Sequence, residues 1–288
     1  MSQKPSRLST PIDFDAPGKQ CDYVRLPHSV HRSAYGWLPI PIVCIRNGEG
    51  PTVLLMSGTH GDEYEGQVTL SKLVNQLEAD DINGRLIILP MANFPAAKAG
   101  LRTSPIDELN LNRVYPGDPD GLPTMQIAYY IETVLMEMAD YGLDLHSGGS
   151  SLHYLPSAVG SGGIESDGAK VRELMKVFGS PYSIFLPGRH AGGGGSGDGA
   201  ARQNMLSFGT EMGGSGTVTP DCLEHCYNGV VRARKPPLDL MQSREISFKK
   251  VSKAAEPVKC SQAIEVTLHT VAQKVEGCTH RTEHGVSA

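Results

Sequence analysis

A histidine and a glutamate stand three residues apart directly after a short apolar run. His60 and Glu63 lie within residues 57–66, Ser-Gly-Thr-His-Gly-Asp-Glu-Tyr-Glu-Gly, which follow the apolar residues 52–56. Where a strand gives way to a helix, this spacing lets both side chains point to one spot above the sheet edge. Imidazole and carboxylate groups suit Zn²⁺, and a catalytic zinc site needs a third protein ligand beside them.

A second histidine can supply that ligand. His146 lies within residues 144–149, Asp-Leu-His-Ser-Gly-Gly, at the end of another apolar run. The carboxyl ends of parallel strands share one edge of a sheet, so we expect His146 beside His60 and Glu63. The alternative is structural, with His60 capping the helix and His146 an ordinary histidine at the sheet edge. Three ligand-type residues at strand ends favour one zinc ion per chain.

A zinc hydrolase also needs a general base that takes a proton from the attacking water. Glu211, within residues 208–214, Phe-Gly-Thr-Glu-Met-Gly-Gly, again ends a strand-like run and enters a glycine turn. A carboxylate there could take the proton and pass it to the leaving amine. Asp62 and Glu65 compete for this role, although their position beside the ligands also suits orienting a ligand or capping the helix.

Arginines follow the second predicted strand and could bind an acidic substrate. Arg102 and the run Asn110-Leu-Asn112-Arg113 lie in an irregular segment before the next predicted helix. An arginine fork binds a carboxylate in bidentate fashion, and a second arginine near the metal could stabilise the oxyanion of a hydrolysed amide. The alternative is two surface arginines and a loop asparagine.

Short apolar runs alternate with amphipathic stretches from residue 52 onward. Apolar side chains recur at helical spacing in residues 70–77, 127–138 and 171–178. We expect strands at residues 52–56, 86–89, 142–146, 182–186 and 206–211. Strands that alternate with helices predict an α/β fold, with a twisted, largely parallel (mixed) sheet and helices on both faces.

Two stretches break this order. Residues 190–199 are a glycine-rich run without apolar anchors, for which we expect mobility. Beyond Pro220 the charge balance turns basic and helical faces are weak. We therefore divide the chain into a zinc-dependent catalytic α/β domain, residues 1–222, and a small, divergent, β-leaning C-terminal region, residues 223–288.

The composition excludes several functions. The chain has 288 residues, with 26 Lys and Arg against 31 Asp and Glu, a net charge of −5. This balance lacks the positive field that nucleic acid requires, and no apolar run approaches the roughly 20 residues of a membrane span. The 6 cysteines are too scattered for a disulfide scaffold, and the N-terminus lacks a signal-peptide stretch. We expect a cytoplasmic globular protein without nucleic-acid or membrane partners. The sequence is compatible with a homo-oligomer.

Four segments in order resemble the succinylglutamate desuccinylase/aspartoacylase family of zinc-dependent amide hydrolases, relatives of the zinc carboxypeptidases. They are residues 58–66, 110–113, 144–149 and 209–214. The resemblance runs from about residue 11 to residue 230 and implies a zinc carboxypeptidase-like fold. It implies that zinc is held by His60, Glu63 and His146, with Glu211 as the general base. It further implies that the substrate carboxylate is held by Asn112 and Arg113, with Arg102 facing the scissile carbonyl.

Within this family, residues 11–19 and 102–107 look most like the enzymes that deacetylate N-acetyl-2,4-diaminobutyrate in ectoine breakdown. The resemblance therefore implies hydrolysis of the amide bond of a small N-acyl amino acid. The alternatives are a zinc carboxypeptidase that cuts peptides and an inactive zinc-binding relic. From about residue 231 the sequence departs from the β-rich final domain of this branch, so we expect a truncated or frame-shifted C-terminal region.

Overall fold

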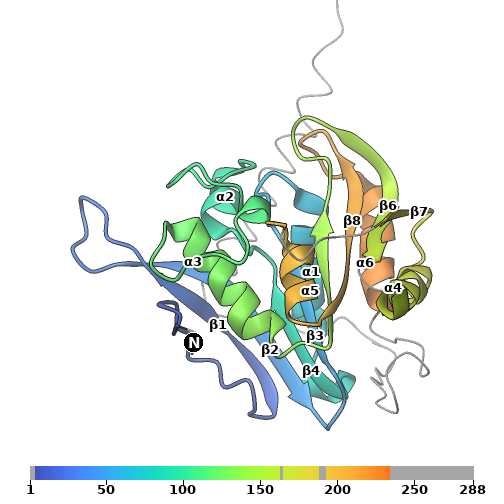
Figure 1. Cartoon of the computed structure of the whole chain (residues 1–288), viewed down its shortest axis with the longest axis horizontal. Helices are drawn as coiled ribbons and strands as arrows, with labels where there is room; N and C mark the ends of the chain where they lie inside the picture. Colours follow the sequence, from blue (N-terminus) through green and yellow to red (C-terminus); the bar gives the residue numbers. More distant parts are fainter. Residues whose placement is uncertain (1–3, 163–164, 188–192, 234–288) are drawn as a thin grey trace, which may run out of the picture.

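An eight-stranded sheet with helices on both faces forms the part of the chain that the computed structural model describes, residues 4–162, 165–187 and 193–233 (Figure 1). The strand order is β1-β2-β4-β3-β5-β8-β6-β7. The strands are β1 (Gly18–Pro27), β2 (Trp37–Asn47), β3 (Thr52–Ser57), β4 (Gly84–Leu89), β5 (Tyr141–His146), β6 (His153–Gly162), β7 (Tyr182–Pro187) and β8 (Leu206–Gly214). The α-helices are α1 (Tyr64–Gln76), α2 (Phe94–Ala99), α3 (Pro123–Tyr130), α4 (Glu165–Phe178), α5 (Ser196–Arg202) and α6 (Pro220–Ala233). The described residues also form three short helices: the 3₁₀ turns η1 (Ala79–Asp81) and η2 (Leu111–Arg113) and the π-helix η3 (Ile131–Met136).

The centre of the sheet is parallel and the flanks are mixed. Strands β4, β3, β5 and β8 run in the same direction, whereas β2 pairs with β4, and β6 with β8, in antiparallel fashion. The carboxyl ends of β3, β5 and β8 therefore lie at one edge. This is the mixed, largely parallel sheet that the sequence predicts, and its central carboxyl edge is where ligands bind in such folds.

Each face of the sheet is covered by its own helical layer. Apolar residues of α1, α4 and α6 pack on one face, and apolar residues of α2, α3, η3 and α5 pack on the other. Strand β3 is buried along its whole length, as expected for a central strand covered on both sides. The two layers fix the central strands, so the side chains at their ends are held by a rigid scaffold.

The strands and helices predicted between residues 52 and 211 are present, with one change of type. The predicted helix 127–138 is α3 followed by the π-helix η3. The antiparallel pair β1–β2 and strand β6 were not predicted. Strands β1 and β6 carry mixed polar and apolar residues, and β2 is apolar but contains Pro39 and Pro41. Strand β6 pairs with β8, about 50 to 60 residues further along the chain.

The β character predicted for residues 223–288 is wrong for residues 223–233, which belong to helix α6 (Pro220–Ala233). The buried residues of α6 recur at helical spacing, so the helical pattern is present in the sequence but rests mostly on small side chains. They are Cys222, Cys226, Gly229, Val230 and Ala233. A Cβ at Gly229 would lie 2.3 Å from the ring of Phe178, so this glycine lets α6 approach α4 closely. The predicted boundary at residue 222 falls inside α6. Residues 234–288, with the rest of the predicted C-terminal region, lie outside the described residues.

The glycine-rich run also departs in part from its predicted mobility. Residues 196–199 form the first turn of helix α5, and Gly195 N donates to the Asp198 carboxylate at 2.9 Å. Residues 188–192 lie outside the described residues. The end of this run is thus a fixed part of the structure above the sheet.

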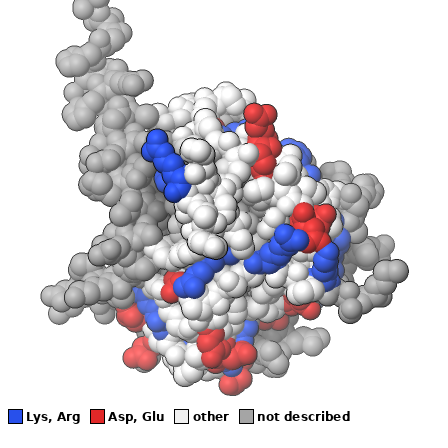
Figure 2. Space-filling view, turned by 90° about the vertical axis from the view of Figure 1, so that its left-hand side faces the viewer, with Lys and Arg blue, Asp and Glu red and all other residues white. Residues whose placement is uncertain are grey.

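The surface and the helices add two observations. On the face shown in Figure 2, acidic and basic side chains are interspersed. Within the described ranges, we find no helix with the length and apolar character needed to cross a bilayer.

Candidate metal centre and active site

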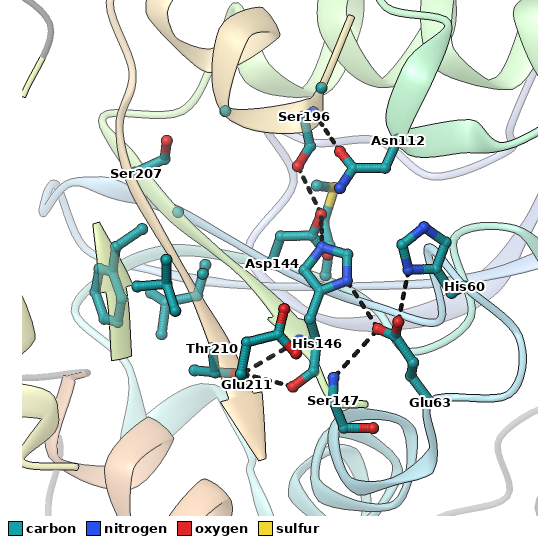
Figure 3. Close-up of a pocket in the computed structure, with 18 of the residues that line it drawn as sticks. His60, Glu63, Asn112, Asp144, His146, Ser147, Ser196, Ser207, Thr210 and Glu211 are labelled. Atoms are coloured by element: carbon teal, nitrogen blue, oxygen red, sulfur yellow. Dashed lines mark hydrogen bonds and ion pairs between the residues drawn. The ribbon is translucent and has the colours of Figure 1, made fainter. Parts of the chain in front are cut away.

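Three ligand-type side chains meet at the carboxyl edge of the central strands (Figure 3). His60 follows β3, Glu63 immediately precedes α1, and His146 is the last residue of β5. Their ligand atoms all lie within 4.8 Å of one another. Glu63 stands between the two rings, with Oε1 at 2.6 Å from His60 Nδ1 and Oε2 at 2.8 Å from His146 Nδ1. In the described part of the chain, this is the one cluster of His, Cys, Asp and Glu side chains found suited to a metal ion.

Each histidine is held from its other nitrogen by an oxygen atom. His60 Nε2 lies 3.0 Å from Asn110 Oδ1, which also accepts a hydrogen bond from Asn112 N at 2.9 Å. His146 Nε2 lies 3.0 Å from Asp144 Oδ2. With a metal ion bound, these acceptors would favour the proton on Nε2 and leave the two Nδ1 lone pairs free for the metal. Metal-binding histidines have this arrangement, because the acceptor fixes both the tautomer and the ring orientation.

Asp144 connects the candidate metal centre to helix α5. Its Oδ1 accepts from Thr59 Oγ1 at 2.9 Å, and its Oδ2 accepts from Ser196 Oγ at 2.7 Å. Neither Asp144 nor Ser196 was predicted as a site residue. The signal for Asp144 was its position two residues before His146, which places both side chains on one face of a strand. No local signal marks Ser196.

The charges of the cluster shift the pKa values of Glu63, Asp144 and His146. Burial by itself would raise the pKa of Glu63, but His146 and His60 outweigh it and lower that pKa to about 2. Burial likewise opposes ionisation of Asp144, yet His146, Ser196 and Thr59 lower its pKa to about 2. Burial would lower the pKa of His146, whereas Asp144 and Glu63 raise it well above its usual value. The pocket thus holds two carboxylates as anions, and a proton on His146 balances part of their charge. A bound cation would take the place of that proton.

Glu211 lies beside His146, because these residues are paired in register across β5 and β8. Its Oε2 is buried and has no hydrogen-bond partner among the described residues. Burial is the main cause that raises its pKa to about 7, with a further contribution from the charge of Glu63 against the opposing effect of His146. A carboxyl group with a pKa near 7 is suited to accept and return a proton.

The predicted arginines and asparagine also face this site. Arg102 Nη1 donates to Glu63 Oε1 at 3.2 Å, and its side chain is 48% exposed. Asn112 Oδ1 accepts from Ser196 N at 2.8 Å, with its amide nitrogen turned into the pocket (Figure 3). Arg113 is exposed and donates to the Asn112 carbonyl at 2.7 Å.

Asp62 and Glu65, the other candidates for the general base, lie outside the cavity. Asp62 Oδ2 accepts from both the amide and the hydroxyl of Ser150, at 2.8 Å each, so it fixes the turn after β5. Glu65 is fully buried, and a Cβ at Gly213 would lie 2.8 Å from its Oε1. Neither residue lines the pocket that contains Glu211.

A single cavity of about 570 Å³ joins these groups. Its lining includes every residue predicted for the site, namely His60, Glu63, Arg102, Asn112, Arg113, His146 and Glu211. The volume lies within the range of small-molecule pockets. The arrangement combines three possible metal ligands, a proton acceptor and two guanidinium groups, which suits metal-assisted hydrolysis of a small anionic compound.

Comparisons with known proteins agree with this chemistry. The model of the succinylglutamate desuccinylase/aspartoacylase catalytic domain matches residues 49–235. The chain is 45% identical over 232 residues to the N-alpha-acetyl-L-2,4-diaminobutyric acid deacetylase of Halomonas elongata. The aligned region covers 79% of this chain and 67% of that protein.

Two solved structures have the same architecture. The product-bound ectoine utilization protein EutE (DoeB) of Ruegeria pomeroyi superposes with a TM-score of 0.79 and 37% identity, over 89% of this chain and 76% of that one. A succinylglutamate desuccinylase of Silicibacter sp. TM1040 gives a TM-score of 0.78 and 36% identity, over 88% of this chain and 75% of that one.

Proposed function

Because the chain belongs to the succinylglutamate desuccinylase/aspartoacylase family, we propose that it is a zinc-dependent deacetylase of N-acetyl-2,4-diaminobutyrate in ectoine breakdown. The reaction adds water across the amide bond and yields acetate and 2,4-diaminobutyrate. The observation that carries the proposal is the convergence of the ligand atoms of His60, Glu63 and His146 beside Glu211 in one cavity. The similarity to a diaminobutyrate deacetylase and to an ectoine utilization protein supports the choice of substrate.

His60, Glu63 and His146 would hold one Zn²⁺ per chain. Two imidazole nitrogens and one carboxylate are a ligand set typical of catalytic zinc, which keeps a further position open. Bound zinc would polarise the scissile carbonyl and lower the pKa of water at the site. The fit rests on the Nδ1 atoms that converge on Glu63 and on the oxygen acceptors behind both rings.

Glu211 would move the proton. Its buried and unpartnered Oε2 takes a proton from the attacking water and delivers it to the amide nitrogen as the C–N bond breaks. Arg102, whose guanidinium already contacts Glu63, would donate a hydrogen bond to the oxygen that becomes negative. Both roles need the side chains to reach the reacting atoms, and both residues line the cavity.

Arg113 and Asn112 would hold the α-carboxylate of the substrate. Arg113 supplies a planar fork, and Asn112 supplies an amide donor fixed in place by the bond from Ser196 N. Both lie on or next to η2, above the sheet and beside the candidate metal centre. A substrate anchored there presents the amide next to its carboxylate to Glu211.

The test compares hydrolysis of N-acetyl-2,4-diaminobutyrate with metal content in the parent and in His146→Ala. We expect about one zinc per chain and turnover in the parent, with both reduced in the variant. Short peptides assayed in parallel address the alternative zinc carboxypeptidase. Cleavage of peptides without deacetylation, an absence of bound metal, or bound zinc without any turnover would each contradict the proposed function.

A further inference from the structure

The floor of the cavity is built in three rows that cross strands β5 and β8. Paired residues of neighbouring strands lie on one face, and successive rows are two residues apart, about 6.6 Å along the strands. From the metal centre inward, the rows are His146 with Glu211, Asp144 with Gly209, and Gly142 with Ser207. All of these residues line the same cavity, which therefore extends two rows inward from the candidate metal centre.

The inner rows are walled by apolar side chains. Leu54 and Met56 of β3, Met136 of η3 and Met205 before β8 line the cavity, and each is at most 6% exposed. The oxygens of Asp144, the buried carboxylate of these rows, are already bonded by hydroxyl groups and a histidine. This inner chamber, defined by the rows of Gly209 and Ser207, thus suits a hydrocarbon chain better than a carboxylate or an ammonium group.

Gly209 keeps the chamber open beside His146. A Cβ at this position would lie 3.2 Å from the Asp144 carbonyl oxygen and 3.8 Å from His146 Cδ2, with no further non-neighbouring heavy atom within 4 Å. A larger side chain would therefore project into the cavity. Gly209 does not have a positive φ, so its backbone does not require glycine. Glycine at this position leaves room in the cavity and is not needed for the backbone conformation.

The chamber is longer than an acetyl group requires. The acetyl methyl is one bond from the scissile carbon, so with the carbonyl at the metal centre it stays within the row of His146 and Glu211. The row of Gly209 then remains open to a longer acyl chain. The row of Ser207 is filled on the β5 side, because a Cβ at Gly142 would lie 2.7 Å from the Leu54 carbonyl oxygen and 3.1 Å from Met205 Cε, so this row ends the chamber. The amino-acid half of the substrate would point away from them, because Arg113 lies at the exposed part of the cavity.

We propose that the inner chamber accepts the acyl chain, so that the protein also hydrolyses N-acyl amino acids with straight acyl groups longer than acetyl. Gly209 and Ser207 set the chain length that fits. The reaction is unchanged: water adds to the carbonyl, the C–N bond breaks, and a fatty carboxylate and an amine leave. This inference rests on the proposed function and extends its substrate class.

The test measures kcat/KM of the zinc-loaded full chain for N-acetyl-, N-butyryl- and N-hexanoyl-2,4-diaminobutyrate. We expect the parent to hydrolyse the butyryl compound within about tenfold of the acetyl compound, because the open row takes up the two added methylenes. A pocket closed to them would lower kcat/KM much further, since one methylene that does not fit costs roughly 10- to 200-fold. Gly209→Val should lower the butyryl-to-acetyl ratio at least tenfold. Ser207→Leu, two rows from the metal ligands, should lower the hexanoyl-to-butyryl ratio by a similar factor.

Ser183→Leu is the matched control, because Ser183 is exposed on β7 and does not line the cavity. It should leave all three ratios unchanged. A parent that hydrolyses the acetyl compound but not the butyryl compound, or ratios that do not change in Gly209→Val and Ser207→Leu, would overturn the inference.

A binding measurement separates this inference from the proposed function. If no compound is hydrolysed, the proposed function fails, and calorimetric binding of N-hexanoyl-2,4-diaminobutyrate still tests the chamber. Weaker binding to Ser207→Leu than to the parent supports an acyl chain in the chamber. Equal binding to both proteins overturns it.

Discussion

Asp144→Asn should weaken zinc binding while preserving the fold. The amide has the volume of the carboxylate, and the Thr59 and Ser196 hydroxyls can each reorient to donate or accept, so these two contacts survive. The bond that changes is the charge-assisted one to His146 Nε2, 3.0 Å long. Loss of such a partner costs about 10- to 100-fold in metal affinity, or roughly 1.4–2.7 kcal/mol. Competition with a chelator of known affinity measures the change.

Ser196→Ala is the matched control for this prediction. It removes one hydrogen bond to Asp144 and leaves the carboxylate charge beside His146 in place. Zinc affinity should then change less than about threefold, well below the effect of removing the charged partner. The reasoning is refuted if Asp144→Asn binds zinc as tightly as the parent, or if both variants lose affinity equally.

The remaining predictions concern catalysis, recognition and stability. Glu211→Gln should lower kcat by about 10²- to 10⁴-fold with unchanged zinc content by metal analysis, because the proton acceptor is lost and the ligands remain; a loss under tenfold would reject its role. Arg113→Lys should recover part of the roughly 10- to 100-fold loss in kcat/KM of Arg113→Ala, and the α-amide of the substrate should show no further loss in Arg113→Ala. Arg202→Ala should cost about 3–5 kcal/mol in urea unfolding, because it leaves the Glu132 carboxylate, bonded at 2.8 Å, buried without its cation. Glu132→Gln in that background should restore part of the stability, and a cost below 1 kcal/mol would contradict the assignment. Burial raises the pKa of Cys44 to about 11, so its thiol should stay unreactive toward alkylating reagents in the native protein at pH 9; the unfolded thiol ionises first, so its contribution to stability should fall as pH rises above about 9. Rapid native alkylation of Cys44, mapped by mass spectrometry, would contradict this.

Local sequence was sufficient to predict the central strands and the strand ends that carry the candidate metal ligands. The continuous apolar run of β3 predicts a strand buried on both faces, and the spacing of His60 and Glu63 places both just beyond it. Alternating strands and helices predict a parallel centre, which puts His146 and Glu211 at the same edge. These inferences need only the spacing of apolar residues and the direction of the strands, and both follow from short segments of sequence.

Local sequence was insufficient for strands whose pairing decides their structure, and one local pattern was missed. Strand β1 mixes polar and apolar residues, and β2 is interrupted by Pro39 and Pro41, so both become evident through pairing with their neighbours. Helix α6 was missed although its buried residues recur at helical spacing, because cysteine, glycine and alanine carry less apolar surface than leucine or isoleucine. For the strands, pairing rather than intrinsic preference decides the secondary structure.

The sequence by itself thus determined the ligand-type residues, the edge on which they stand and the class of fold. Tertiary structure alone decided what holds those residues and what space they face. The oxygen behind His60 comes from Asn110, fifty positions away along the chain, and the hydroxyl on Asp144 comes from Ser196 of a different helix. The open chamber at Gly209 likewise exists through the stacking of several elements over β5 and β8. Periodicity encodes direction and burial within a segment, whereas hydrogen-bond partners and cavities arise between segments and depend on how their side chains pack together.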